Sequence, residues 1–220
     1  MKKFELTAEF ITNVFGKKLF RIKALVAFGN VKKGELGGFI EKEDNLSHSG
    51  NAWVSGDAWV SGNACVSGDA RVYGNAQVSG DARVSGNARV SGDARVSGNA
   101  RVSGNARVSG DARVYGDAWV YDNAHVSGDA RVSGDAWVYG NADYAVVTGF
   151  GRYFRATTFF RCKDKIIRVQ CGCFYGDLAQ FREIVKKTHG DSKYAKEYLA
   201  IADLMELHFS DEEENQEAAK

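Results

Sequence analysis

Residues 82–109 read ARVSGNARVSGDARVSGNARVSGNARVS, part of a six-residue repeat that continues well beyond this stretch. Valine recurs every six residues from Val54 to Val138, which makes fifteen consecutive hexads of the form V-S/Y-G-D/N-A-x. The valine and the alanine four positions later are the small apolar sites, so both are expected to point inward. Gly-Asp or Gly-Asn between them supplies a corner that tolerates left-handed backbone angles. The pattern predicts a parallel β-helix with three flat faces and about five coils, stacked at about 4.8 Å.

The repeat resembles the hexapeptide-repeat family, in which an aliphatic residue followed four positions later by a small one forms left-handed parallel β-helices. The resemblance covers residues 46–144. It implies a fold without implying an activity. The predicted fold class is therefore mainly β: a left-handed parallel β-helix with an N-terminal β cap and a small C-terminal α+β cap.

Outward side chains of the repeat are expected to form columns along the helix. The expected arginine columns are Arg71, Arg89 and Arg107 on one face, Arg95, Arg113 and Arg131 on the next, and Arg83 and Arg101 on the third. A column of corner residues can form a hydrogen-bonded amide ladder: Asp69, Asn87, Asn105, Asn123 and Asn141. Between residues 53 and 143 there are ten aspartates and eight arginines. This balance favours a solvated, salt-bridged exterior, with a phosphate-binding face as the alternative.

The two ends of the repeat carry large aromatic residues in place of arginine or serine. Exposed aromatic columns are costly in water, so the terminal segments or a second subunit are expected to cover them. Residues 1–45 alternate apolar and polar side chains and are predicted to form a β-hairpin cap that turns near residues 13–18. Because the open end of a parallel β-helix is an unpaired edge, a homo-oligomer is also expected.

Residues 145–209 are predicted to form a separate α+β domain. Strands are expected at 154–162 and 166–174. Asp177 then caps a helix through about Thr188, with Gln180 in the capping-box position, and a second helix runs from Ser192 to about Phe209. Residues 210–220 lack apolar periodicity and are predicted to be a disordered acidic tail.

The C-terminal region resembles the ends of uncharacterised bacteriophage and prophage proteins in the stretches TTFFRCKD, CGCFYGDLAQF and THGDSKYAKEYLA. This resemblance implies a phage or prophage origin. It does not by itself imply a function.

The strongest candidate for a ligand-binding segment is residues 144–176. This segment contains six basic residues and one acidic residue, with aromatic residues between them. Guanidinium groups on phosphate and rings stacked on a base would suit a nucleotide-type ligand. The predicted ligand contacts are Arg152, Tyr153, Arg155, Thr157, Thr158 and Arg168. The alternative is that the aromatic residues form the core of the domain and the basic residues form its solvated side.

Two other chemistries have candidate residues. Cys162, Cys171, Cys173 and His189 could form a zinc site, but a C-x-C pair without a second spaced pair is a weak signal, so free thiols and no metal are predicted. Many hexapeptide-repeat proteins are acyltransferases with a histidine general base, for which His125 and His189 are the candidates. The uninterrupted repeat differs from that subset, and no cofactor is expected.

Composition bounds the partners. The 29 lysines and arginines nearly balance 28 aspartates and glutamates, and no long apolar stretch occurs, so neither a membrane nor an extended nucleic acid is expected as a partner. A bacterial cytoplasm is the expected location. The predicted function is that of a non-enzymatic, oligomeric binding protein of phage or prophage origin. Its concrete form is an anti-defence protein that sequesters a nucleotide-type signal or blocks a host immune protein. A coenzyme A-dependent acyltransferase and a structural or assembly scaffold remain as alternatives.

Overall fold

The computed structural model describes residues 1–210, so all but the first residue of the predicted tail at 210–220 lie outside the described residues. The chain divides into two compact units, Met1–Asn141 and Ala142–Lys220. Within residues 1–210, no helix has the length and apolar character needed to cross a membrane.

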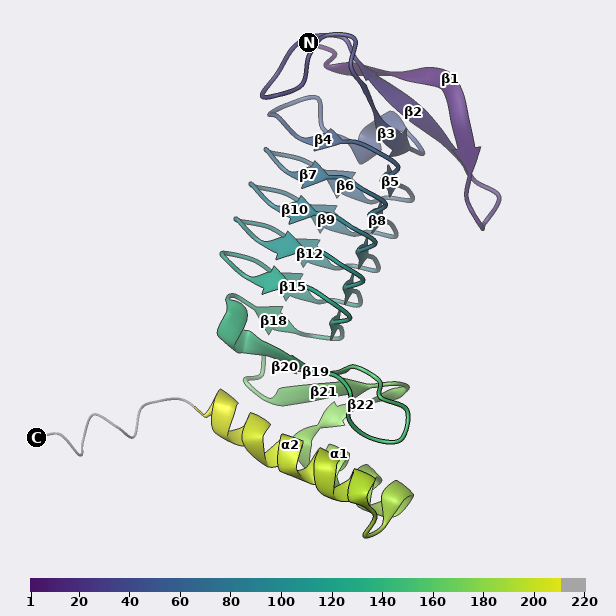
Figure 1. Cartoon of the computed structure of the whole chain (residues 1–220). Coiled ribbons are helices and arrows are strands. Elements are labelled where there is room, and N and C mark those ends of the chain that lie inside the picture. The colour runs from purple at the N-terminus through teal and green to yellow at the C-terminus, as the bar shows by residue number, and fades with distance from the viewer. Residues whose placement is uncertain (211–220) are drawn as a thin grey trace, which may run out of the picture. The chain divides into compact units, whose positions relative to one another are not determined.

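The first unit is a β-solenoid of about six turns (Figure 1). Each hexad contributes one two-residue strand, and every third strand is stacked in parallel on the same face. The strands are β4 (Trp53–Val54), β5 (Trp59–Val60), β6 (Cys65–Val66), β7 (Arg71–Val72), β8 (Gln77–Val78), β9 (Arg83–Val84), β10 (Arg89–Val90), β11 (Arg95–Val96), β12 (Arg101–Val102), β13 (Arg107–Val108), β14 (Arg113–Val114), β15 (Trp119–Val120), β16 (His125–Val126), β17 (Arg131–Val132) and β18 (Trp137–Val138).

Small side chains fill the solenoid interior, as the repeat predicts. The valines from Val54 to Val138 and the alanines between them expose at most 1% of their surface. Burying one valine stabilises the fold by roughly 1.5–3 kcal/mol relative to leaving it exposed. Backbone hydrogen bonds join successive coils, as where Arg89 N donates to Ala106 O at 2.9 Å. The corners use glycine in the left-handed region, for example Gly86 at φ +64°.

The predicted columns are confirmed by the strand register. Arg89 is paired with Arg71 on one side and with Arg107 on the other. The predicted amide ladder is present for its three middle members, because Asn87 Nδ2 donates to Asn105 Oδ1 and Asn105 Nδ2 donates to Asn123 Oδ1, both at 3.2 Å. Its two end members bond elsewhere: Asp69 Oδ1 accepts from Asn51 Nδ2, and Asn141 Oδ1 accepts from His125 N.

The predicted salt-bridged exterior is wrong for most of the repeat. Among the described residues, the seven repeat arginines from Arg71 to Arg113 form no ion pair with a carboxylate. Four corner aspartates, Asp69, Asp81, Asp93 and Asp117, instead accept hydrogen bonds from asparagines of the preceding coil. Asn75 Nδ2 donates to Asp93 Oδ1 at 3.0 Å, and Asn99 Nδ2 donates to Asp117 Oδ1 at 2.8 Å. The arginines therefore stand in columns of like charge.

The N-terminal segment forms the predicted hairpin and then joins the solenoid. β1 (Phe4–Thr12) and β2 (Lys18–Ala24) are antiparallel, and β3 (Leu36–Ile40) pairs antiparallel with β2 and parallel with β5. A short 3₁₀ helix, η1 (Glu43–Asn45), follows. The hairpin thus extends one solenoid sheet (Figure 1). The expected covering of terminal aromatics holds for Trp53, which is buried with its ring 5.4 Å from that of Phe28.

Lys3 is a buried cation at the start of the solenoid, where Nζ donates to Ala52 O at 2.8 Å and to Gly50 O at 3.3 Å. Burial lowers its pKa from 10.5 to about 8, although the charge of Asp69 opposes this shift. Between these two pH values the unfolded chain binds more protons at Lys3 than the folded chain does, so this group makes stability rise with pH.

We therefore expect the free energy of unfolding to gain up to about 3 kcal/mol from Lys3 as pH rises from about 8 to about 10.5. Urea unfolding of wild type and Lys3→Met across this range measures the effect as the difference between the two proteins. A pH-independent difference would contradict the low pKa.

The second unit is a four-stranded antiparallel sheet with two helices. The strands, in both chain and sheet order, are β19 (Tyr144–Val147), β20 (Thr157–Arg161), β21 (Ile167–Cys171) and β22 (Phe174–Asp177). A 3₁₀ helix, η2 (Asn141–Asp143), precedes them. The prediction of two strands missed β19 and β22. β20 starts at Thr157, later than the predicted start at residue 154, because Phe154 has φ +52° and so cannot be part of a strand. β21 ends at Cys171, before the predicted end at residue 174, because the chain turns at Gly172, which has φ +60°.

Both predicted helices are confirmed. α1 (Leu178–His189) begins at Asp177, whose carboxylate accepts from Gln180 N while Gln180 Oε1 accepts from Asp177 N. α2 (Lys193–Phe209) begins at the Ser192 cap. The shared core of sheet and helices consists of Phe159, Val169, Leu178, Phe181, Val185, Ala195, Tyr198, Ile201, Ala202, Met205 and Phe209.

Candidate functional site

The loop between β19 and β20, residues 148–156, is attached to helix α2. Gly151 N donates to Glu197 Oε2 at 2.9 Å. Gly151 has φ +72°, and a Cβ atom there would overlap the phenol ring of Tyr198. Only glycine allows this close approach without displacing the ring. The attachment places the next residues of the loop beside the helical layer.

A pocket of about 230 Å³ opens beside this loop. Its walls come from the loop, from the turn between β21 and β22, and from both helices. The lining residues are Arg152, Tyr153, Arg155, Cys171, Gly172, Cys173, Phe174, Phe181, Ile184, Val185, Thr188, His189 and Tyr198. Most of the wall is aromatic or aliphatic, and the loop contributes two cations.

The two cations of the loop flank one aromatic ring. The guanidinium carbon of Arg152 lies 5.5 Å from the ring centroid of Tyr153, and that of Arg155 lies 5.1 Å from it. Both distances are within the range of cation–π attraction. Tyr153 is 64% exposed, so this ring and the two guanidinium groups are available to a ligand.

Tyr198 is a largely buried member of the pocket wall. Burial, followed by the neighbouring Cys171 thiol, raises the pKa of Tyr198 to about 12, so its hydroxyl stays protonated at neutral pH. The Thr157 hydroxyl donates to Cys171 Sγ at 3.2 Å. The His189 ring lies 5.8 Å from that of Tyr198. A ligand in the pocket would therefore meet the hydroxyl-bearing side chains of Tyr153, Thr188 and Tyr198 among mainly apolar surfaces.

The structure brings together three of the six predicted ligand contacts, because Arg152, Tyr153 and Arg155 all line the pocket. Thr157 and Thr158 are buried in β20 and do not line the pocket. Thr157 acts only indirectly, through its hydrogen bond to the lining residue Cys171. Arg168 also lies outside it, because its Nη2 is paired with Asp164 Oδ2 at 2.7 Å.

Sequence reasoning missed the helical half of the pocket. Phe181 and Tyr198 fall on the apolar stripes of α1 and α2, so the pattern shows them only as core residues. The one signal that could have found them is Gly149-Phe150-Gly151, since a glycine in a basic, aromatic loop indicates close approach by another side chain.

The three cysteines and the histidine considered as zinc ligands do not form a cluster. Cys171, Cys173 and His189 line the same pocket, whereas Cys162 is buried in a different place. Within residues 1–210, no three side chains of His, Cys, Asp or Glu are arranged to hold a metal ion.

The two histidines proposed for acyl transfer lie in different units. His125 projects from β16, with its Nε2 3.3 Å from Ser109 Oγ, and His189 ends α1 at the pocket.

Comparison with known families bears on the solenoid. The family described as the YdcK β-solenoid repeat matches residues 64–80, 76–92, 82–98, 94–110, 100–116, 106–122 and 124–140. No curated protein matches the chain. The matched residues all lie in the repeats of the first unit.

Proposed function

We propose that the second unit binds a small, planar, anionic ligand of nucleotide type, and that the β-solenoid is its non-enzymatic scaffold. The observation that carries this proposal is the meeting of Arg152, Tyr153 and Arg155 at a pocket whose walls are aromatic. Cations and stacking surfaces together favour a ligand that has both a charged group and a flat ring.

The size of the pocket suits part of such a ligand. Ligand pockets commonly enclose about 300–1,000 Å³, so the 230 Å³ here suits one planar ring system better than a whole nucleotide. The base would lie against Phe174, Phe181 and Tyr198. The phosphates would remain at the rim with the two arginines, where bidentate hydrogen bonds can form.

The proposed biological role, action against host defence, is based on the resemblance of the C-terminal region to phage and prophage proteins. A phage protein that holds a nucleotide-type signal would lower its free concentration in the host and act against host defence. Left-handed winding, self-association and a cytoplasmic location belong to the same proposal, and native mass spectrometry would report the number of subunits.

Isothermal titration calorimetry with ATP, AMP, adenosine and inorganic phosphate tests the proposal. We expect the two nucleotides to bind at least about tenfold more tightly than adenosine or phosphate alone, because a charge-assisted hydrogen bond contributes about 1.5–3 kcal/mol. Arg155→Ala should weaken nucleotide binding by about ten- to a hundredfold. Lys186→Ala is the matched control: it removes one positive charge from an exposed position of α1 outside the lining.

Other outcomes favour the alternatives. Binding of coenzyme A with acyl transfer that is lost in His189→Ala or His125→Ala would indicate an enzyme. No saturable binding of any nucleotide at millimolar concentration, with an intact oligomer, would indicate a scaffold and contradict the proposal.

A further inference from the structure

One face of the solenoid carries three arginines in a straight row, independent of the pocket in the second unit. Arg71, Arg89 and Arg107 are register partners on β7, β10 and β13. Parallel strands stack about 4.8 Å apart, so the row spans about 10 Å along the solenoid axis. We call these three residues the arginine row.

The arginine row has no internal compensation for its charge. Among the described residues, none of its guanidinium groups forms an ion pair or donates a hydrogen bond to another residue of the chain. Like charges directly opposite on neighbouring strands repel each other. A bound chain of anions would remove this repulsion and supply acceptors to every guanidinium.

Each arginine column lies between two corners, and the corner that follows it carries one asparagine and two aspartates in both columns: Asn75, Asp93 and Asp111 after the arginine row, and Asn99, Asp117 and Asp135 after the second column. The two columns differ at the corner that precedes the arginines. The residues two positions before the three arginines are Asp69, Asn87 and Asn105. The second arginine column, Arg95, Arg113 and Arg131, has Asp93, Asp111 and Asp129 in the same positions. Equal numbers of arginines therefore produce a more positive surface along the arginine row than along the second column.

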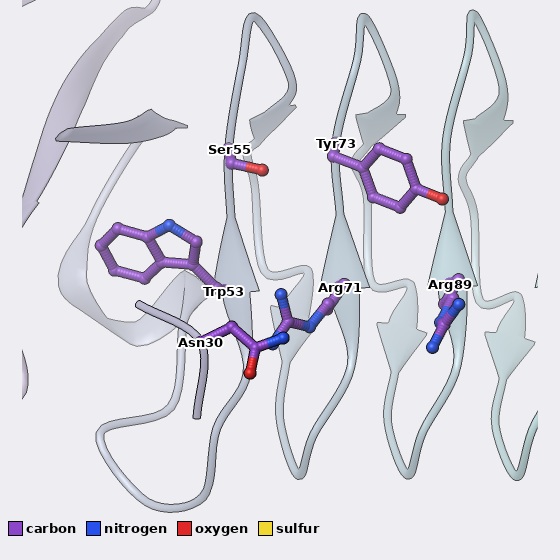
Figure 2. A pocket seen from close by; sticks show the side chains of 6 residues that line it. All are labelled: Asn30, Trp53, Ser55, Arg71, Tyr73 and Arg89. Atoms are coloured by element: carbon purple, nitrogen blue, oxygen red, sulfur yellow. The ribbon is translucent and has the colours of Figure 1, made fainter. Parts of the chain in front are cut away.

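The first two arginines of the row border a hollow of about 440 Å³. Figure 2 shows Trp53 at one end, with Ser55 and Tyr73 along one side of the row and Asn30 beside Arg71. The hydroxyls of Ser55 and Tyr73 and the amide of Asn30 can donate hydrogen bonds to anionic oxygens. Guanidinium, hydroxyl and amide donors in one hollow form a set that suits phosphate.

We propose that the arginine row binds a short inorganic phosphate chain along the solenoid axis, with one end of the chain in the Trp53–Tyr73 hollow. A linear chain matches a linear row of cations better than a single anion does. Single-stranded nucleic acid fits less well, because it needs aromatic rings on which successive bases stack. On this face the Trp53 ring is buried and Tyr73 alone is an exposed aromatic of the hollow.

Binding of sodium tripolyphosphate and of orthophosphate at matched ionic strength tests the proposal. All proteins carry Arg155→Ala, so that the pocket of the second unit does not contribute. We expect tripolyphosphate to bind at least about tenfold more tightly than orthophosphate, and Arg89→Gln to weaken it by at least about tenfold. Glutamine is compatible with the repeat, since Gln77 occupies the corresponding outward position of β8.

Arg113→Gln is the matched control, because it removes the middle arginine of the second column, which also borders a hollow with Ser97 and Tyr115. It should change tripolyphosphate affinity by less than about twofold. Equal losses in both variants would show a general charge effect and overturn the proposal. Binding of a single-stranded DNA oligomer as tightly as tripolyphosphate, with the same dependence on Arg89, would also overturn it. Loss of nucleotide binding in the Arg155→Ala background bears only on the pocket of the second unit.

Discussion

Gly86→Ala is expected to destabilise the solenoid by about 2–4 kcal/mol, the sum of a left-handed backbone penalty and a steric clash between coils. Gly86 has φ +64°, and a Cβ atom there would lie 2.9 Å from Gly104 N of the next coil. Because every coil must keep the same spacing for its backbone hydrogen bonds, the clash cannot be relieved locally.

Gly128→Ala is the control for this prediction. Gly128 has φ +62°, but a Cβ atom there would meet no other atom within 4 Å. Only the backbone penalty of about 1–2 kcal/mol should remain. Urea unfolding followed by circular dichroism measures both variants. Equal losses at the two positions would mean that contact between coils contributes nothing to the requirement for glycine.

Phe181→Ala is expected to destabilise the second unit by about 3–5 kcal/mol. Phe181 is 2% exposed, and its ring centroid lies 5.6–6.0 Å from those of Phe159, Phe174 and Tyr198. Because a unit of this size has a small free energy of unfolding, the substitution should unfold it at moderate temperature and abolish nucleotide binding.

The helical signal in circular dichroism is a selective measurement of this unfolding, since α1 and α2 are the α-helices of the described chain and both lie in the second unit. Leu207→Ala is the matched control, because Leu207 is 71% exposed on α2. It should change stability by less than about 0.5 kcal/mol. Retention of the helical signal and of ligand affinity in Phe181→Ala would contradict the packing described for the pocket wall.

The solenoid could be predicted from the sequence because its period is local and strict. A valine every six residues determines which side chains are buried, and the same period brings Arg71, Arg89 and Arg107 into one column. The pairing of the charges could not be predicted. The composition gives only the numbers of aspartates and arginines. Which groups pair depends on the corner geometry, which places Asp93 and Asp117 beside asparagines of the neighbouring coils.

The pocket could be predicted only in part. Arg152, Tyr153 and Arg155 are neighbours in the chain, and the mixture of cations and rings is visible there. Tyr198 reaches the same place from α2 through tertiary packing, for which a sequence pattern gives no signal. Arg168 satisfies the same pattern, yet it pairs with Asp164 four residues earlier in the chain.

Photo-crosslinking with 8-azido-ATP, followed by mass spectrometry of the labelled peptides, tests most directly whether the second unit holds the ligand. We predict label on peptides that contain Tyr153, Phe174 or Tyr198, removal of the label by excess ATP, and strong reduction of the label in Arg155→Ala but not in Lys186→Ala. Label restricted to residues 1–141, or label that excess ATP does not remove, would contradict the account.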